Sequence, residues 1–504
     1  MDFDDLQKEV FGDDENGGLQ GSIPPAVLAL MATLQLGTPI TGDEVSFHDD
    51  AQIVLPKGMT FERAAEIFER LKEEQETVVD FTQQFFYRPD DGAVATAEVL
   101  SRLFGMTVGE EIDMGFFGKR RPESRSVKIS ATKTVQVPWG LISIPSLEGV
   151  RITLCGHHVH ELYGQIFDLH VEAPRKFKPQ IEAIFAAIEE ELQVNSIYRG
   201  KALVGVNDLE FLDLTEFIES KYKEIVFSDD VLDKLETVWA PIRYTAALEA
   251  EGARLKRSAL LFGPYGTGKS SAGLLTAKLA LENGWTFISA RTGVDQIEDV
   301  LRFARMYMPA VVFVEDVDGQ TSSDDATEVA LGLEAFDGIT AKGGKLILIV
   351  TSNHEEKIHR GFLRPGRLDA VIKVAGLDQN GAERLIKAVV APDKLDPAID
   401  YIKLYEAMDG YTPAFVREVA DRAKLFAISR LKGDRNYVLG TEDLISAALS
   451  LRDQFELLTE AGEGIPRSGI DGALGAMVHE QVRQAVDGFR VDFNRDVLRR
   501  PDGK

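Results

Sequence analysis

The chain has 504 residues, 44% of them hydrophobic and 27% charged, a balance typical of a soluble globular protein with about three domains. Its net charge of −26 opposes non-specific attraction to nucleic acids and anionic membranes. Cys155 is the single cysteine, so no intrachain disulfide can form, and we expect a reducing, cytoplasmic location.

The N-terminal part predicts a loosely ordered segment followed by a helix. Residues 1–58 are acidic, then punctuated by Gly and Pro, and predict a partly flexible segment without a signal peptide. Its apolar stretch, 23–36, is too short to span a bilayer. Residues 59–86 repeat apolar side chains at helical spacing and predict one amphipathic helix.

A β-rich region follows. Between residues 127 and 171 apolar and polar side chains alternate, as in short β-strands. A helix is predicted over 179–193, and two strand-like runs, KALVGV and LEFLDL, end near residue 214. We interpret residues 59–214 as a separate α+β domain that contacts a substrate or partner.

Strands and helices alternate over residues 215–377, which predicts an α/β fold with a doubly wound parallel sheet. The predicted strands are SALLFG, WTFISA, AVVFVEDVD and KLILIVTSN. Residues 378–458 are helical in pattern and predict a small lid domain, and residues 459–504 predict a helical tail.

The most specific motif is LLFGPYGTGKSS, which joins a predicted strand to a predicted helix. Its Gly-x-x-x-x-Gly-Lys-Ser spacing is that of a phosphate-binding loop. Glycines let successive backbone N–H groups point at phosphate oxygens, and the N-terminus of the following helix favours the same anion. We predict that Lys269 contacts the β- and γ-phosphates and that Ser270 coordinates Mg²⁺. The nucleotide-binding residues predicted from this loop are Gly263, Pro264, Tyr265, Gly266, Thr267, Gly268, Lys269, Ser270 and Ser271.

Three further groups of residues predict hydrolysis. Glu315 and Asp316 follow a buried strand, where Glu315 would hold Mg²⁺ through water and Asp316 would polarise the attacking water. Asn353 ends the next strand and would orient that water. Arg364 and Arg367, in GFLRPGRLD, would stabilise the charge that develops on the γ-phosphate, supplied by a neighbouring subunit.

These motifs, in this order, resemble the AAA family of ring-forming ATPases over about residues 216–455. The resemblance implies ATP and Mg²⁺ at the junction of two subunits in a closed homo-oligomeric ring, usually a hexamer, with a heptamer as the alternative. It also implies that residues 225–242 lie against the adenine, with Asp230 and Val231 as the named contacts.

Two departures from the family pattern narrow the resemblance. Most relatives have Asp-Glu where this chain has Glu315-Asp316, and the short interval 291–310 lacks an aromatic tip that grips an extended substrate. Both features, together with the runs LEAFDGI, TSNH and YTPAFVREV, resemble the branch that includes the mitochondrial translocase of the Rieske iron–sulfur protein, whose members move folded cargo. The transmembrane anchor of that branch is not predicted in these residues, and we expect no membrane span.

Other features allow two interpretations. His157, His158 and His160, beside Cys155, suggest a metal site, but alternate residues of a strand face opposite ways and no second ligand pair is spaced for zinc, so we favour strand histidines. The basic loop 116–125 fits a solvated loop better than a nucleic-acid contact. Arg417 fits a nucleotide sensor and a salt-bridged lid face equally well.

Three classes of function fit the motifs. Our first choice is an ATPase that remodels, chaperones or translocates a protein, recognised by the N-terminal domain, because the motifs are complete and the net charge disfavours nucleic acid. The alternatives are a nucleic-acid loader or helicase, and an ATP-binding switch or scaffold with slow turnover, since Asp316 is one methylene shorter than the usual Glu.

Overall fold

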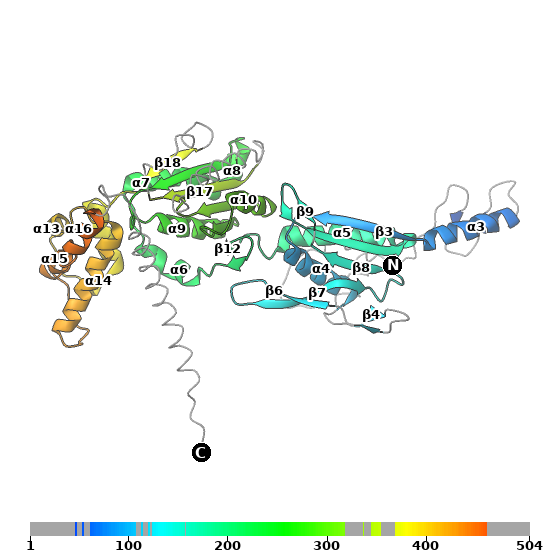
Figure 1. Cartoon of the computed structure of the whole chain (residues 1–504), viewed down its shortest axis with the longest axis horizontal. Coiled ribbons are helices and arrows are strands. Elements are labelled where there is room, and N and C mark those ends of the chain that lie inside the picture. The colour runs from blue at the N-terminus through cyan, green and yellow to red at the C-terminus, as the bar shows by residue number, and fades with distance from the viewer. Residues whose placement is uncertain are drawn as a thin grey trace, which may run out of the picture. The chain divides into compact units, whose positions relative to one another are not determined.

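The computed structural model (Figure 1) describes residues 46–47, 53–54, 61–106, 112–113, 119–120, 123–156, 158–317, 336, 344–353 and 368–460. It divides into two compact units, Met1–Gly381 and Ala382–Lys504. The first unit contains a five-stranded and a seven-stranded sheet, and the second is described on its own below.

The five-stranded sheet has the order β3-β11-β8-β7-β6, and its neighbours are antiparallel. The inward side chains of its central strands, such as Ile152, Leu154, Leu169 and Val171, are buried, and two helices pack on the sheet. This is the α+β part expected from the alternating pattern. Its elements are β3 (Val78–Phe85), α4 (Pro89–Phe104), β6 (Glu123–Lys128), β7 (Thr134–Ser143), β8 (Arg151–Cys155), β11 (Phe167–Pro174), η2 (Arg175–Phe177) and α5 (Lys178–Asn195).

The helix predicted over 59–86 is wrong beyond Glu76. Helix α3 (Phe61–Glu76) ends there, and β3 pairs with β11 over its whole length. Val78 and Phe85 are seven residues apart, which places both on one face of a helix but on opposite faces of a strand. Val78 is 60% exposed and Phe85 1% exposed, as the strand requires. Short strands β1 (Ser46–Phe47), β2 (Ile53–Val54), β4 (Ile112–Asp113), β5 (Lys119–Arg120), β9 (Val159–His160) and β10 (Gly164–Gln165) form three hairpins.

The seven-stranded sheet has the order β13-β12-β15-β16-β17-β14-β18. All neighbours are parallel except the edge pair β12 and β13, which agrees with the predicted α/β fold. The parallel strands place their carboxyl ends along one edge of the sheet. The strands are β12 (Ala202–Val204), β13 (Glu210–Phe211), β14 (Arg257–Phe262), β15 (Thr286–Ala290), β16 (Ala310–Val314), β17 (Leu346–Ser352) and β18 (Ala370–Lys373).

The runs KALVGV and LEFLDL were expected to close the preceding domain, and this expectation is wrong. They form β12 and β13, and β12 lies parallel to β15 with Leu203 opposite Ile288. Both of these side chains are buried. The partner strand is distant in sequence, so the alternating pattern alone did not show which sheet the two strands join.

Helices cover both faces of the seven-stranded sheet, which is the doubly wound arrangement. Alternate residues of β16 belong to different cores: Val311 and Phe313 pack with α7 and α9, and Val312 packs with α10. The core on the α10 side is continuous with that of the five-stranded sheet. The helices are α6 (Thr215–Glu219), η3 (Lys221–Glu224), α7 (Asp229–Arg243), α8 (Thr245–Ala250), α9 (Lys269–Glu282) and α10 (Ile297–Met306).

The second unit is helical in the residues that are described. Its helices α14 and α15 pack together around Val419, Ala423 and Leu444, and the Tyr411 hydroxyl donates to the Ala448 carbonyl at 2.8 Å. The elements from here to the end are α12 (Gln379–Val389), η5 (Pro392–Lys394), α13 (Tyr401–Ala407), α14 (Pro413–Arg430), α15 (Thr441–Leu449) and α16 (Arg452–Glu460). Nearly all of the predicted tail 459–504 lies outside the described residues.

A buried carboxyl group lies in the first turn of α4. The Asp91 carboxylate accepts hydrogen bonds from Ser196 Oγ at 2.6 Å and from the Ile197 amide at 3.0 Å. Burial nevertheless raises the pKa of Asp91 to about 6, against an ordinary value of 3.8, and the hydrogen bonds and Arg199 oppose this rise. Asp91 is therefore a group whose protonated form favours the folded state.

Asp91→Asn should remove a pH dependence of stability. The raised pKa gives a stabilisation that is complete below about pH 4 and is lost as the pH rises to about 6, a total of about 3 kcal/mol. The free energy of unfolding of Asp91→Asn, relative to wild type, should therefore rise by up to that amount across this window, measured by urea titration. Asp80→Asn, at an exposed position of β3, serves as the control. A difference between Asp91→Asn and wild type that stays flat with pH would contradict the raised pKa.

Candidate functional site

The loop after β14 has a backbone that only glycine accepts readily. Gly263, Gly266 and Gly268 have φ values of 153°, 76° and 103°, which side-chain-bearing residues rarely adopt. A Cβ on Gly263 would lie 2.1 Å from the Val374 carbonyl oxygen. The loop therefore passes close to neighbouring backbone and opens directly into α9, whose first residue is Lys269.

Lys269 lies inside this loop. Its side chain is 6% exposed, and Nζ donates to the carbonyl oxygens of Gly263 at 2.7 Å and Pro264 at 2.9 Å. The Thr267 hydroxyl also donates to the Pro264 carbonyl, at 2.9 Å. A buried ammonium, left-handed glycines and the N-terminus of a helix of 14 residues together fit a bound polyphosphate. Ser270 is exposed at the same end of α9, where solvent and a hydrated cation can reach it. Tyr265, in the loop itself, is 69% exposed.

The two carboxylates follow β16 at the same edge of the sheet. Val314 pairs with Val350, and Phe262, the last residue before the loop, pairs with Ser352. Both Glu315 and Asp316 thus emerge two strands away from the phosphate loop, with β17 between. The Glu315 carbonyl accepts from the Thr292 hydroxyl at 3.1 Å, which ties it to the segment after β15.

Asp316 and Asn353 meet directly. Asn353 Nδ2 donates to Asp316 Oδ1 at 2.6 Å, and Asp316 has a φ of 46°. Left-handed φ is uncommon outside glycine, though Asp tolerates it better than most residues, and such positions concentrate at functional sites. The structure therefore brings together two of the side chains expected to handle the attacking water.

The other predicted residues divide into three groups. Arg364 and Arg367 lie outside the described residues. Both Asp230 and Val231 lie in the first turn of α7: Asp230 is exposed and pairs with Lys234 at 2.6 Å, while Val231 is buried in the core. Arg417 lies on α14 of the second unit.

Phe227 lies within 225–242, the stretch expected beside the adenine, but it was not among the named contacts, and it contacts the loop. A Cβ on Gly268 would lie 3.1 Å from its ring, so the aromatic side chain closes the carboxyl end of the phosphate loop. It is buried and immediately precedes Ser228, the N-cap residue of α7. An aromatic residue before a helix cap is too common a pattern to signal such a contact.

The described histidines of the Cys155 segment have other surroundings. The His160 ring lies 5.3 Å from that of Phe86 and 5.2 Å from that of Tyr163, and its Nδ1 accepts from the Leu162 amide. His157 lies outside the described residues. Among those described, no group of three metal-ligating side chains comes together. None of the described helices has the length and apolar character to cross a bilayer.

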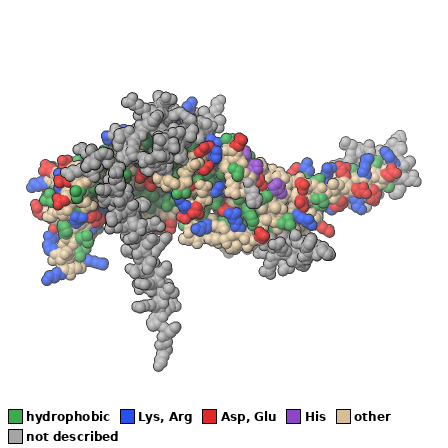
Figure 2. All heavy atoms as spheres, viewed as in Figure 1, with side chains coloured by type: hydrophobic (Ala, Val, Ile, Leu, Met, Phe, Trp, Pro, Cys, Tyr) green, Lys and Arg blue, Asp and Glu red, His purple; other side chains and the backbone are tan. Residues whose placement is uncertain are grey.

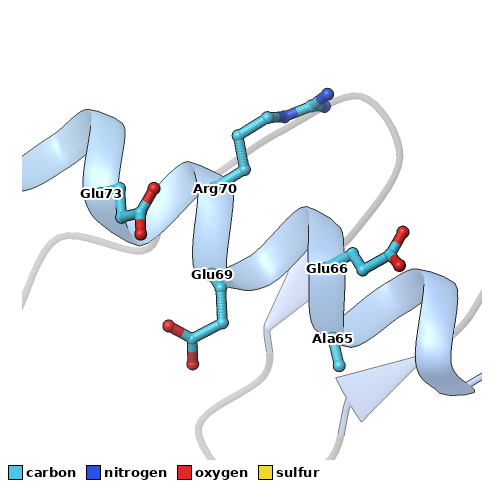
Figure 3. Close-up of a pocket in the computed structure, with 5 residues that line it drawn as sticks. All are labelled: Ala65, Glu66, Glu69, Arg70 and Glu73. Atoms are coloured by element: carbon cyan, nitrogen blue, oxygen red, sulfur yellow. The ribbon is translucent and has the colours of Figure 1, made fainter.

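An open, solvent-exposed cavity of about 590 Å³ lies along α3 (Figure 3), but its chemistry does not suit a nucleotide. Three carboxylates and one arginine line it, so its acidic wall would repel phosphates. The lining residues are Ala65, Glu66, Glu69, Arg70 and Glu73. We therefore place the candidate site at the phosphate loop and not in this cavity.

Comparison with known proteins identifies the domain that holds this site. Residues 259–375 match the family described as "ATPase family associated with various cellular activities (AAA)". The chain is 27% identical over 246 residues to the ATP-dependent zinc metalloprotease FtsH 1 of Petrotoga mobilis, covering 45% of this chain and 37% of that protein. It is 26% identical over 230 residues to FtsH 2 of Symbiobacterium thermophilum, covering 42% and 38%. The match thus spans less than half the length of these relatives. The chain carries an ATPase domain of the AAA family.

Proposed function

We propose that this protein hydrolyses ATP and uses the energy to remodel, chaperone or translocate a protein substrate. One observation carries the proposal. A buried lysine in a glycine loop and the hydrogen-bonded pair Asp316 and Asn353 lie at the same edge of a parallel sheet. An anion site and an acid–amide pair at the same edge suit phosphoryl transfer to water.

Each residue has a role that follows from its chemistry. Lys269 and the loop amides hold the phosphates, and Ser270, with Glu315 acting through water, holds Mg²⁺. The bound Mg²⁺ would neutralise charge on the phosphate oxygens. Asp316 accepts a proton from the attacking water, and Asn353 orients both. We propose that Asp230 and Val231, in the first turn of α7, contact the adenine.

Assembly and partners are also proposals. The family resemblance supports a closed ring, with Arg364 and Arg367 of one subunit completing the site of the next. The five-stranded domain is the proposed contact for the protein substrate, and a cytoplasmic location remains our expectation. On the face that Figure 2 shows, the described Lys and Arg side chains are mixed with Asp and Glu, whereas nucleic-acid binding needs basic side chains gathered in one area.

We further propose that the substrate is not threaded through a pore as an extended chain. The only aromatic residues of the interval 291–310 are Phe303 and Tyr307. They are 2% and 0% exposed and pack against each other with ring centroids 4.9 Å apart. Side chains held in the core cannot grip a moving chain, which supports the likeness to the translocase branch.

Asp316→Asn tests the proposal. The variant should bind ATP as the wild type does but lose hydrolysis by a factor on the order of 10² or more, because the amide cannot take the proton from water. Phosphate release with Mg²⁺ measures the rate, and calorimetry measures the binding. Asp299→Asn, an acid-to-amide change on α10, is the matched control.

The same variant should hold its substrate in the presence of ATP. Protein captured on it should remain folded, which a fluorescent reporter fused to the captured protein would show. Hydrolysis at the wild-type rate in Asp316→Asn would overturn the catalytic assignment. ATP-driven loss of reporter fluorescence with the wild-type chain would overturn the proposal that the substrate is not threaded.

A further inference from the structure

The end of the carboxylate strand departs from a regular parallel ladder. Ala310 pairs with Leu346, and its amide donates to the carbonyl of the preceding residue, Lys345, at 2.9 Å. In a parallel ladder this pattern repeats at every second residue. If this pattern continued regularly from Ala310, the amide of Asp316 would donate a hydrogen bond to the carbonyl of Thr351.

A different pair of hydrogen bonds is observed. The amide of Val317 donates to the Thr351 carbonyl at 3.0 Å, and the amide of Asp316 donates to the Thr351 hydroxyl, also at 3.0 Å. Two consecutive amides therefore bond to one residue of the neighbouring strand. This is the pattern of a β-bulge with one extra residue, and the left-handed φ of Asp316 accommodates that residue.

The Thr351 hydroxyl supplies the acceptor that this bulge needs. β17 reads LILIVTS, an aliphatic strand until Thr351, which is 2% exposed. A valine there would fill the same volume but would leave the Asp316 amide, which is partly buried, without this acceptor. Because side chains alternate along a strand, a slip of one residue would turn the Asp316 carboxylate to the other face of the sheet, away from Asn353.

We infer that Thr351 is a positioning residue for hydrolysis: its hydroxyl holds the backbone bulge that places the Asp316 carboxylate against Asn353. The inference rests on the proposed role of Asp316. Thr351 acts on the backbone of Asp316, and Asn353, two residues further along the same chain, acts on its side chain at 2.6 Å. The end of β17 thus fixes both the backbone and the side chain of Asp316, and neither hydrogen bond involves a residue of the phosphate loop.

The test separates the hydroxyl from the size of the side chain. Thr351→Ser and Thr351→Ala differ by one oxygen atom, and Thr351→Val keeps the size of threonine. We expect kcat for ATP hydrolysis to fall on the order of tenfold or more in the Val and Ala variants and to stay within about twofold of wild type in the Ser variant, since only Ser keeps the acceptor. KM and the Kd for ATP should change little in all three, because the phosphate loop is untouched.

Thr96→Val is the matched control. Thr96 is also fully buried, and its hydroxyl donates to the Gly92 carbonyl within α4, in the five-stranded domain. Thermal melting of each variant checks the fold, and the Ser and Ala pair decides the question if the Val variant does not fold. Equal kcat in Thr351→Ser and Thr351→Ala would overturn the inference, as would parallel losses of kcat and ATP affinity. A wild-type protein that binds ATP without hydrolysing it would instead overturn the proposed function, and the inference with it.

Discussion

Lys269→Ala is expected to abolish ATP binding while leaving the fold intact. The ammonium of Lys269 is the only basic group among the described loop residues 263–271, and it is held in the loop by two carbonyl oxygens. Its removal takes away the charge that would meet the β- and γ-phosphates in a place screened from water, where charge-assisted hydrogen bonds are strongest. We expect the Kd for ATP to rise on the order of 100-fold or more, measured by titration calorimetry.

The control for this variant is a lysine on the same helix. Lys278 lies about two and a half turns after Lys269 on α9, is paired with Glu282 and faces the ring of Tyr222. Lys278→Ala should keep wild-type affinity for ATP, because this cation is engaged away from the loop. Thermal melting would confirm that both variants fold. Wild-type affinity in a folded Lys269→Ala protein would remove the phosphate loop from the proposed site.

The parallel sheet could be predicted because its signal is local. The runs SALLFG, AVVFV and LILIV are short and apolar, and each becomes a strand with every or nearly every residue buried. The glycine spacing of the phosphate loop is also a local signal, since Gly263, Gly266 and Gly268 each adopt a positive φ at their own position. Such features need no knowledge of distant partners.

The sequence-based predictions failed where the structure of a segment depends on a partner strand that is distant in sequence. The apolar residues of 59–86 recur at a spacing that fits a helix, and only pairing with β11, about 90 residues later, makes Val78–Phe85 a strand. The strands β12 and β13 were recognised as strands, but their sheet was decided by β15. Propensity and periodicity describe a segment, whereas sheet membership is a property of two segments.

The candidate site also contains residues with a local sequence signal and residues whose role depends on distant partners. Lys269, Asp316 and Asn353 could be named from their motifs, and the structure places the last two in contact. Phe227 and Thr351 lie in stretches that were recognised, 225–242 and KLILIVTSN, but nothing in the sequence assigns a role to these two side chains. The contact of Phe227 depends on Gly268 lacking a side chain, and that of Thr351 depends on an extra residue in the neighbouring strand. Their signals exist only in the backbone geometry.

Negative charge builds up on the γ-phosphate during its transfer to water, and an arginine supplied by a neighbouring subunit can stabilise it. The proposed arginines are Arg364 and Arg367 of a neighbouring subunit. Arg364→Ala and Arg367→Ala should each keep the affinity of wild type for ATP but lose hydrolysis by a factor on the order of 10³, the usual effect of removing an arginine that contacts the transferring phosphate. Phosphate release and calorimetry distinguish the two properties.

Mixing subunits tests whether these arginines act across an interface. A subunit with Lys269→Ala cannot bind ATP but still carries both arginines, whereas a subunit with Arg364→Ala or Arg367→Ala binds ATP but lacks one of them. In a mixed ring, an arginine-deficient subunit that follows a Lys269→Ala subunit would again have a complete site, so hydrolysis should partly return. The recovery should depend on the mixing ratio, with a maximum at intermediate ratios, since only unlike neighbours complement each other. Mass measurement of the assemblies would establish that the subunits had mixed. Mixed rings as inactive as either parent would show that Arg364 and Arg367 do not complete the site of a neighbour.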